Sequence, residues 1–317
     1  MPTPSALPTP AELNRTLPFA AGARPWRLVR YACIDWLGIL LCWAAIRFVP
    51  NPFVYVVAVL LIAGRLQAFG VILHDACHLP MRRMTLPLAL VEALAGWTIG
   101  SSIAAMRYHH LRHHRAVGTA EDPYLHRLAA RGGWVQRVMM LRGALLPVWW
   151  PLRALMAPLA LAWPAFRPWY ARGFMQDRSR QDLRRHPEVI ACARADLPHC
   201  AVYLLAIAAV VHWDLPFFTY YGLPWIVGGI MNANRVLLEH QHVEIDERAP
   251  ESIWHMTRTM TFGWIGKLVL YPRNIGYHQV HHAYPALALE HLPAVHRYLT
   301  DGTAFAPSAS GQAGSTR

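Results

Sequence analysis

The chain has 317 residues, of which 55% are hydrophobic and 15% are charged, and its formal net charge is +12. Soluble domains average roughly 25% charged residues, so this composition argues against a soluble protein and favours a polytopic membrane protein that folds as one unit. The basic charge does not indicate nucleic-acid binding, because it lies mostly between apolar runs, as in cytoplasmic loops, and no DNA- or RNA-binding motif accompanies it.

Residues 1–30 are interpreted as a flexible, basic N-terminus at the membrane surface, because they lack the apolar core of a secretory signal peptide. Four arginines precede the first apolar run: Arg15, Arg24, Arg27 and Arg30. Positive charge is retained on the cytoplasmic side of membranes, so we expect a cytoplasmic N-terminus. Lys267 is the one lysine, a bias typical of GC-rich genomes, and we therefore expect a bacterial inner-membrane protein.

Four apolar runs approach the length of about 20 residues that a membrane-spanning helix needs. They lie at 31–49, 53–73, 197–213 and 216–232, and the short turns "PNP" and "DLP" join them in pairs. The sequence therefore predicts an all-α integral membrane protein with four transmembrane helices in two hairpins and both termini in the cytoplasm. We expect one domain over 31–300, with a cytoplasmic helical cap, and a disordered low-complexity tail over 301–317.

Two further apolar stretches are ambiguous. Residues 86–105 contain Glu92, and residues 144–165 contain four prolines and Arg153. Prolines inside an apolar run argue against a regular span. In addition, an even number of crossings must separate clusters that lie on one side of the membrane. We therefore expect interfacial or re-entrant helices on the cytoplasmic side in both places.

Eleven of the eighteen histidines occur in four short clusters, each at an expected boundary between membrane and cytoplasm. In chain order the clusters are "HDACH" (74–78), "HHLRHH" (109–114), "EHQHVE" (239–244) and "YHQVHH" (277–282). Residues three or four apart share one face of a helix, and such a face can present three nitrogens to a single point. The clusters predict a dinuclear metal site, but imidazole suits zinc, copper, iron or nickel, so they leave the metal open.

Over roughly residues 50–300 the chain resembles the membrane fatty acid desaturase superfamily of non-haem diiron enzymes. Three histidine boxes carry the resemblance: "HDACH", "HLRHH" and "HQVHH". Their surroundings also match, since "GTAEDP" follows the second box and "AYPALALEHLPAVHRYL" follows the third. The element "RVLLEH" (235–240) resembles the one that supplies a further histidine after the fourth helix.

The resemblance implies nine iron ligands, which would also form the catalytic site: His74, His78, His110, His113, His114, His240, His278, His281 and His282. Two alternatives stay open. His242 competes with His240, because Asn234 does not stand in the usual place before the ligand. His109 leaves the register of the second box open.

The resemblance further implies two iron ions, O₂ as co-substrate, and hydrogen abstraction from a fatty acyl or related alkyl chain. We predict desaturation; hydroxylation and a decarboxylation that leaves a terminal alkene are the alternatives. Electrons must come from a separate ferredoxin, rubredoxin or cytochrome with its reductase, because the five cysteines show no cluster spacing and no haem-binding fusion is present. A membrane metal transporter is a remote alternative, since transporters bind ions near mid-membrane.

Several charged residues are expected near the metal site or inside the membrane. Metal-bound histidines usually donate their other ring N–H to a carboxylate or carbonyl. The candidate carboxylates are Asp75, Asp122, Glu239 and Glu244. For Glu239 an ion pair with Arg235 is the alternative. Arg65 lies inside an apolar run, and we expect it to pair with Glu92 or Asp35; contact with the substrate is the alternative.

Overall fold

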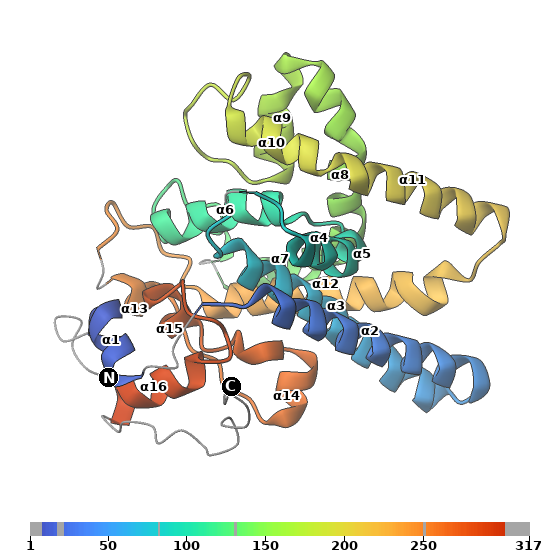
Figure 1. Cartoon of the computed structure of the whole chain (residues 1–317), viewed down its shortest axis with the longest axis horizontal. Helices are drawn as coiled ribbons and strands as arrows, with labels where there is room; N and C mark the ends of the chain where they lie inside the picture. Colours follow the sequence, from blue (N-terminus) through green and yellow to red (C-terminus); the bar gives the residue numbers. More distant parts are fainter. Residues whose placement is uncertain (1–7, 18–21, 82, 130–131, 250–251, 302–317) are drawn as a thin grey trace, which may run out of the picture.

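The structure, a computed structural model, describes residues 8–17, 22–81, 83–129, 132–249 and 252–301. Throughout these residues the regular secondary structure is helical, and one isolated β-bridge joins His240 and Thr257. Figure 1 shows long helices that extend to one side from a compact group of short helices. The all-α prediction is confirmed.

The centre of the molecule is the antiparallel hairpin of α2 (Pro25–Phe48) and α3 (Pro52–Cys77). The "PNP" turn closes it, because Asn51 Oδ1 accepts hydrogen bonds from the backbone N–H groups of Phe53 (2.8 Å) and Val54 (3.3 Å). α3 also packs against α12 (Leu223–Glu239), and its second half is almost continuously buried. α3 is therefore the core helix of the fold.

A sharply bent helix pair covers one side of α3. α4 (Leu86–Val91), the π-helical turn η2 (Glu92–Gly96) and α5 (Trp97–Ile99) lead into α6 (Ile103–Ala116) at an angle of 81°. Gly100 has φ +74° at the bend, and Glu92 Oε2 accepts from the Ile103 N–H at 2.7 Å. This explains the acidic residue in an apolar run, and the bend fits either the re-entrant segment predicted for 86–105 or a broken crossing.

Four stretches are long and apolar enough to cross a membrane: Pro25–Phe48, Pro52–Cys77, Gly133–Ala162 and Pro187–His212. The number agrees with the prediction, and three of the expected runs, 31–49, 53–73 and 197–213, correspond to these stretches. The expected fourth crossing, 216–232, lies in the π-helical turn η6 (Phe218–Gly222) and α12, and it is not among the four. The pairing into two hairpins stays a prediction.

Because of its four prolines we expected no regular span in 144–165, but most of these residues belong to Gly133–Ala162, which is long and apolar enough to cross a membrane. α8 (Leu146–Ala162) runs through Pro151 and Pro158, directly after α7 (Gly133–Leu141) and η4 (Arg142–Leu145). Tertiary contacts override the local preference: buried Arg153 of α8 donates to both carboxylate oxygens of Asp196, at 2.7 and 3.0 Å, and fixes α8 against the neighbouring helices. The same ion pair explains a charge within an apolar helix.

The remaining helices complete the two sides of the molecule. They are η5 (Pro164–Phe166), α9 (Arg167–Phe174), α10 (Pro187–Ala195), α11 (Leu197–His212), α13 (Ser252–Met256), α14 (Trp264–Val269), η7 (Pro272–Asn274), α15 (His278–Ala283) and α16 (Leu292–Asp301). In Figure 1, α13, α15 and α16 lie at one end of the hairpin, and α11 extends toward the same side of the molecule as the α2–α3 turn, with α12 between them.

Part of the N-terminal segment differs from the flexible lead that we expected. Residues 10–16 form α1 (Pro10–Thr16), which starts with a capping box between Thr9 and Glu12. Leu13 and Leu17 are fully buried in a cluster that includes Val280, and Tyr284 Oη donates to the Pro8 carbonyl at 2.7 Å. These contacts order the described residues 8–17 against α15. The tail expected over 301–317 lies almost entirely outside the described residues.

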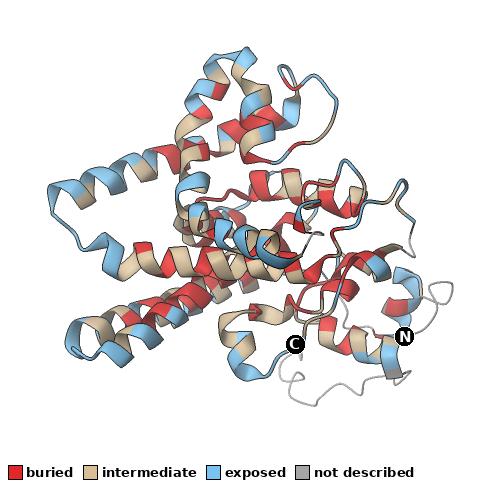
Figure 2. Ribbon diagram, turned by 180° about the vertical axis from the view of Figure 1, so that it is seen from behind, coloured by how far each residue is buried: buried red, intermediate tan, exposed pale blue. Residues whose placement is uncertain are grey.

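Exposed apolar side chains gather at the end of the molecule opposite the histidines. Figure 2 shows burial concentrated where α3 and α12 meet the short helices, and exposure at the tips of the long ones. The exposed residues there include Leu40, Leu41, Phe48, Phe53, Leu204, Leu205 and Val211. Such apolar surface suits lipid rather than water, in agreement with an integral membrane protein.

Candidate metal centre

Four helix termini bring the histidine clusters together. His74 and His78 lie at the end of α3, and α6 carries the second cluster. His240 directly follows α12, and the third box forms α15. The ring nitrogens of nine histidines converge in two groups, and within each group the atoms lie within 4.8 Å of one another. These nine are the residues predicted as ligands.

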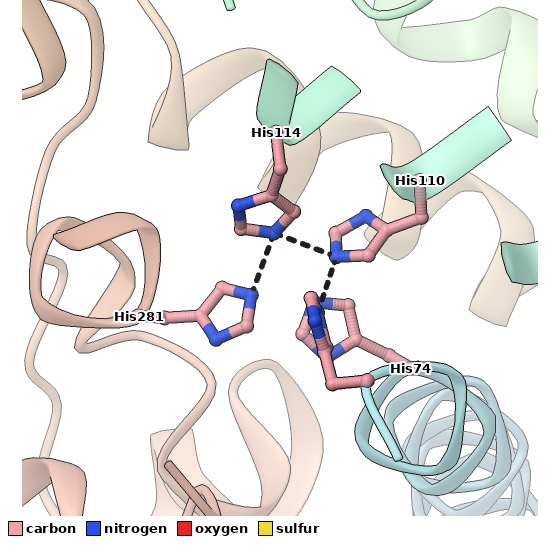
Figure 3. Close-up of side chains that lie close together, drawn as sticks. His74, His110, His114 and His281 are labelled. Carbon is pink, nitrogen blue, oxygen red and sulfur yellow. Dashed lines mark hydrogen bonds between the residues drawn. The ribbon is translucent and has the colours of Figure 1, made fainter. Parts of the chain in front are cut away.

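The first group contains five histidines: His74, His78, His110, His114 and His281. Figure 3 shows the rings of His74, His110, His114 and His281 facing a common point from three different helices. The Nε2 atom of His110 lies 3.0 Å from that of His78 and 2.9 Å from that of His114. The Nε2 atom of His114 is also 3.0 Å from that of His281.

The second group contains His113, His240, His278 and His282. Their Nε2 atoms form a closed ring. His113 lies 2.9 Å from His240 and 3.2 Å from His282, and His278 lies 3.0 Å from His240 and 3.1 Å from His282.

These contacts fit metal ions and do not fit hydrogen bonds. A neutral imidazole nitrogen either donates one hydrogen bond or accepts one, whereas every Nε2 atom of the second group has two nitrogen neighbours. Two nitrogens that bind one ion at about 2.1 Å, at right angles, lie about 3.0 Å apart. The observed separations of 2.9 to 3.2 Å match that spacing. Each group therefore has the donors and the spacing for one ion.

Each HxxHH box is divided between the two groups, which corrects the expectation that one box serves a single point. In α6, His110 and His114 join the first group and His113 the second; in α15, His278 and His282 join the second and His281 the first. Residues at i and i+4 are about 40° apart around a helix, whereas i+3 and i+4 are about 100° apart. The i, i+4 pair therefore joins one group of nitrogens, and the i+3 ring turns to the other group.

One carboxylate holds a histidine of the site. Asp122 Oδ1 lies 2.7 Å from His113 Nδ1, and the backbone N–H groups of Gly118 and Tyr124 donate to the same carboxylate at 2.9 and 2.8 Å. Burial alone would raise the pKa of Asp122, but His113 and these backbone donors lower the pKa to about 2. The charged carboxylate accepts a hydrogen bond from Nδ1–H of His113, which keeps the proton on Nδ1 and leaves Nε2 free to bind a metal.

A comparison with family models now identifies the relationship. The model described as fatty acid desaturase matches residues 50–309. The chain belongs to the fatty acid desaturase family. No curated protein matches it. As a family member this chain is a membrane oxidoreductase that acts on lipid, and its two histidine groups are compatible with metal binding.

In this desaturase-family protein the two candidate ligands His240 and His242 lie in different surroundings. His240 Nε2 belongs to the second group, and its Nδ1 lies 2.9 Å from the Val236 carbonyl. His242 lies outside both groups, and its Nε2 contacts the Leu237 carbonyl at 3.2 Å. His109 is also outside, because its Nδ1 pairs with Tyr124 Oη at 2.8 Å. The ligand role itself stays a prediction.

The third box is kept in the form that binds metal. Burial lowers the pKa of His278, His281 and His282 well below the usual range, and neighbouring histidines lower it further. All three are neutral at neutral pH, so their nitrogens are available as ligands. The Nδ1 atoms of these three histidines and of His110 are buried without a hydrogen-bond partner among the described residues.

The other candidate carboxylates have different partners. Glu239 forms the ion pair with Arg235, at 2.9 Å, and its Oε2 is 3.8 Å from His278 Nδ1, too far for a hydrogen bond. Exposed Glu244 pairs with Arg127. Asp75 lines a cavity together with Arg273 and Glu290, and no histidine of either group lines that cavity. Arg65 pairs with Asp35 at 3.1 Å, one of the two partners expected for it.

Sequence reasoning missed Tyr124. Its ring stacks on His113, with centroids 4.3 Å apart and planes at 24°, while its hydroxyl contacts His109. Tyr124 thus fixes the orientation of a predicted ligand from the side, as Asp122 does through Nδ1. Its position in the sequence could have indicated this role, because Tyr124 is the residue directly after the "EDP" element.

Proposed function

We propose that this protein is an O₂-dependent diiron desaturase that removes two hydrogens from neighbouring carbons of a fatty acyl or related alkyl chain. The reaction balances when one O₂, two electrons and two protons are consumed and two waters are formed for each double bond. The observation that supports it is the pair of buried nitrogen-only groups, five and four histidines, in a member of an oxidoreductase family.

Iron is the proposed metal because O₂ chemistry requires a redox-active ion, and zinc is not redox-active. With O₂ and two electrons, bound iron would supply the oxidant that removes hydrogen from an unactivated carbon. His74, His78, His110, His114 and His281 would hold one ion, and His113, His240, His278 and His282 the other.

The protein's own contribution is orientation and the exclusion of water. Eight of the nine predicted ligands are buried, and His78 is half-buried. Asp122 and Tyr124 fix the His113 ring, and the Val236 carbonyl fixes His240. A dry, fixed site limits side reactions of a strong oxidant with water or with the protein itself.

Electrons are proposed to come from a separate acidic donor such as a ferredoxin, rubredoxin or cytochrome. An open cavity of about 440 Å³ beside α6 is lined by three arginines, Arg112, Arg115 and Arg178, and by two glutamates, Glu121 and Glu188, of which Glu188 pairs with Arg112 at 2.7 Å. Arg115 is exposed and directly follows the predicted ligand His114. Positive charge this close to the metal groups would attract an acidic donor and orient it. The proposed location is the bacterial inner membrane, with termini and histidines on the cytoplasmic side.

The first experiment measures metal content by elemental analysis, in protein purified in mild detergent from iron-supplemented cells, for wild type, His278→Ala and His113→Ala. We expect about two irons per wild-type chain, one for each nitrogen group, and a loss of iron in both variants.

Reconstituted protein with stoichiometric iron is then supplied with a donor system, and the lipid products are analysed. Alkene supports the proposal; alcohol would assign a hydroxylase, and a terminal alkene one carbon shorter a decarboxylase. Absence of stoichiometric metal after reconstitution, with variants like wild type, would reject the diiron enzyme.

A further inference from the structure

The segment 262–269, which contains α14, lies against the middle of α3 although its sequence is no candidate span. Gln67 Nε2 of α3 donates to the Val269 carbonyl at 2.8 Å, and an Arg65 guanidinium N–H donates to the Leu268 carbonyl. Figure 1 shows α14 beside the central hairpin, displaced from α15 toward the long helices. The segment thus leaves the cytoplasmic cap, approaches the membrane helices and returns to the third histidine box.

These two hydrogen bonds satisfy backbone groups that a membrane would otherwise leave unpaired. The last four carbonyls of a helix have no partner within the helix. In α14 the Gly266 carbonyl accepts from the N–H groups of Leu270 and Tyr271, both at 2.8 Å. Arg65 donates to the Leu268 carbonyl and Gln67 to the Val269 carbonyl, two and three residues further along the helix. Unpaired carbonyls are costly in lipid, so polar residues inside an apolar span have a reason to be there.

The contact with α3 is close because it is made at a glycine. A Cβ atom added to Gly64 would lie 2.8 Å from the Leu268 oxygen and 2.9 Å from the Val269 Cα. Both neighbours are backbone atoms, which cannot move aside as the end of a flexible side chain can. A side chain at position 64 would therefore push segment 262–269 away from α3.

The depth of this contact follows from the length of α3. Gln67 is 15 residues from Pro52, the first residue of the helix, and a rise of about 1.5 Å per residue places it about 22 Å along the axis. The hydrocarbon core is about 30 Å thick. With Pro52 at the outer boundary, Gln67 and the carbonyl it binds lie about 8 Å inside the cytoplasmic boundary, a depth usual for helices that insert at the interface.

The outer surface of the segment has the side chains that such a position favours. Trp264 is 76% exposed, Ile265 61% and Phe262 40%. Lys267 is exposed on the same short helix, and its long stem allows the ammonium group to reach the headgroups. Aromatic residues together with lysine are typical of a membrane interface.

We propose that segment 262–269 is inserted into the cytoplasmic leaflet, where Phe262, Trp264 and Ile265 contact lipid acyl chains, and that Gly64, Arg65 and Gln67 hold it against α3. The segment leads through η7 directly into α15. Its insertion therefore fixes to the bilayer the helix that carries three predicted ligands. This inference does not depend on the reaction that the protein catalyses.

The test compares the reactivity of two introduced cysteines in proteoliposomes of purified full-length protein. Trp264→Cys probes the segment, and Val243→Cys probes a loop position that is also exposed, at 56%. Both are made with Cys33→Ser, because the other native cysteines are buried. N-ethylmaleimide crosses membranes but reacts with ionised thiols in water, so we expect position 264 to react on the order of tenfold more slowly than 243. Equal rates would overturn the inserted position.

A second pair of variants tests the contact with α3. Gly64→Ala introduces the clash described above, whereas at Gly70 the same change meets only Ile99 Cδ1, at 3.7 Å. We expect Gly64→Ala to raise the labelling rate at position 264 several-fold, and Gly70→Ala to leave it unchanged. The four buried native cysteines serve as the folding control, because they stay unlabelled only while the variant is folded. Unchanged labelling in Gly64→Ala would overturn the role of α3 in holding the segment.

Discussion

α3 and α11 are both apolar helices of membrane-spanning character, but their surroundings differ. In the most apolar 18 residues of α3 67% of residues are buried within the protein, against 17% in the most apolar 18 residues of the stretch 187–212, which ends with α11. α3 packs against α2, α6, α12 and α14 and ends in two predicted ligands, whereas the exposed side chains of α11 include Leu204, Leu205 and Val211. Two stretches that are both apolar enough to cross a membrane therefore have different roles: α3 is a scaffold for the metal centre, and α11 presents a wall of exposed apolar side chains.

The largest expected effect is the difference between two histidine substitutions, one near the end of α3 and one at the end of α11. His74→Ala removes a predicted ligand of the five-histidine group, so we expect loss of the metal bound there and of all activity. His212→Ala changes an exposed histidine at the end of α11 and should leave metal content and activity as in wild type. Elemental analysis and product formation measure both. Full metal occupancy in His74→Ala would mean that His74 is no ligand.

A second contrast concerns packing. Phe69 of α3 is fully buried, and its replacement by Ala should destabilise the protein by about 3–5 kcal/mol, because a cavity is left behind. Leu205 of α11 is 71% exposed, so Leu205→Ala should change stability by less than about 0.5 kcal/mol. Unfolding in the same detergent compares the two variants. Similar losses would contradict the exposed position of Leu205 and show that α11 packs against a partner in solution.

The smallest expected effect lies in the carboxylates. Asp122→Asn keeps the shape of the residue that holds His113 but removes its charge, and we expect about 10- to 100-fold weaker metal binding. Glu244→Gln makes the same chemical change in an exposed carboxylate that pairs with Arg127, and should leave affinity unchanged. Competition with a chelator of known affinity measures both. Equal affinities in the two variants would remove Asp122 from the site.

Much of the site could be predicted from the sequence because its information is local. The spacing of His110, His113 and His114 identifies rings on one side of a helix, whatever the rest of the chain does. The same holds for the turn at Asn51, whose cap is made with residues two and three positions away. The prolines of α8 predict an interruption that the structure does not have, because the buried pair of Arg153 and Asp196, 43 residues apart in the chain, fixes the helix through a contact that local sequence does not reveal.

The sequence by itself determined the membrane class, the all-α fold and the nine histidines, because composition and helical spacing are properties of neighbouring residues. Only the tertiary structure decided how those histidines divide. His281 lies with His74, and His113 lies with His240, through contacts between residues far apart in the chain. It also decided that segment 262–269 lies beside α3, since the donors for its carbonyls are Arg65 and Gln67, about 200 residues earlier. Helical periodicity specifies the face a side chain occupies, and packing between distant segments specifies what that face meets.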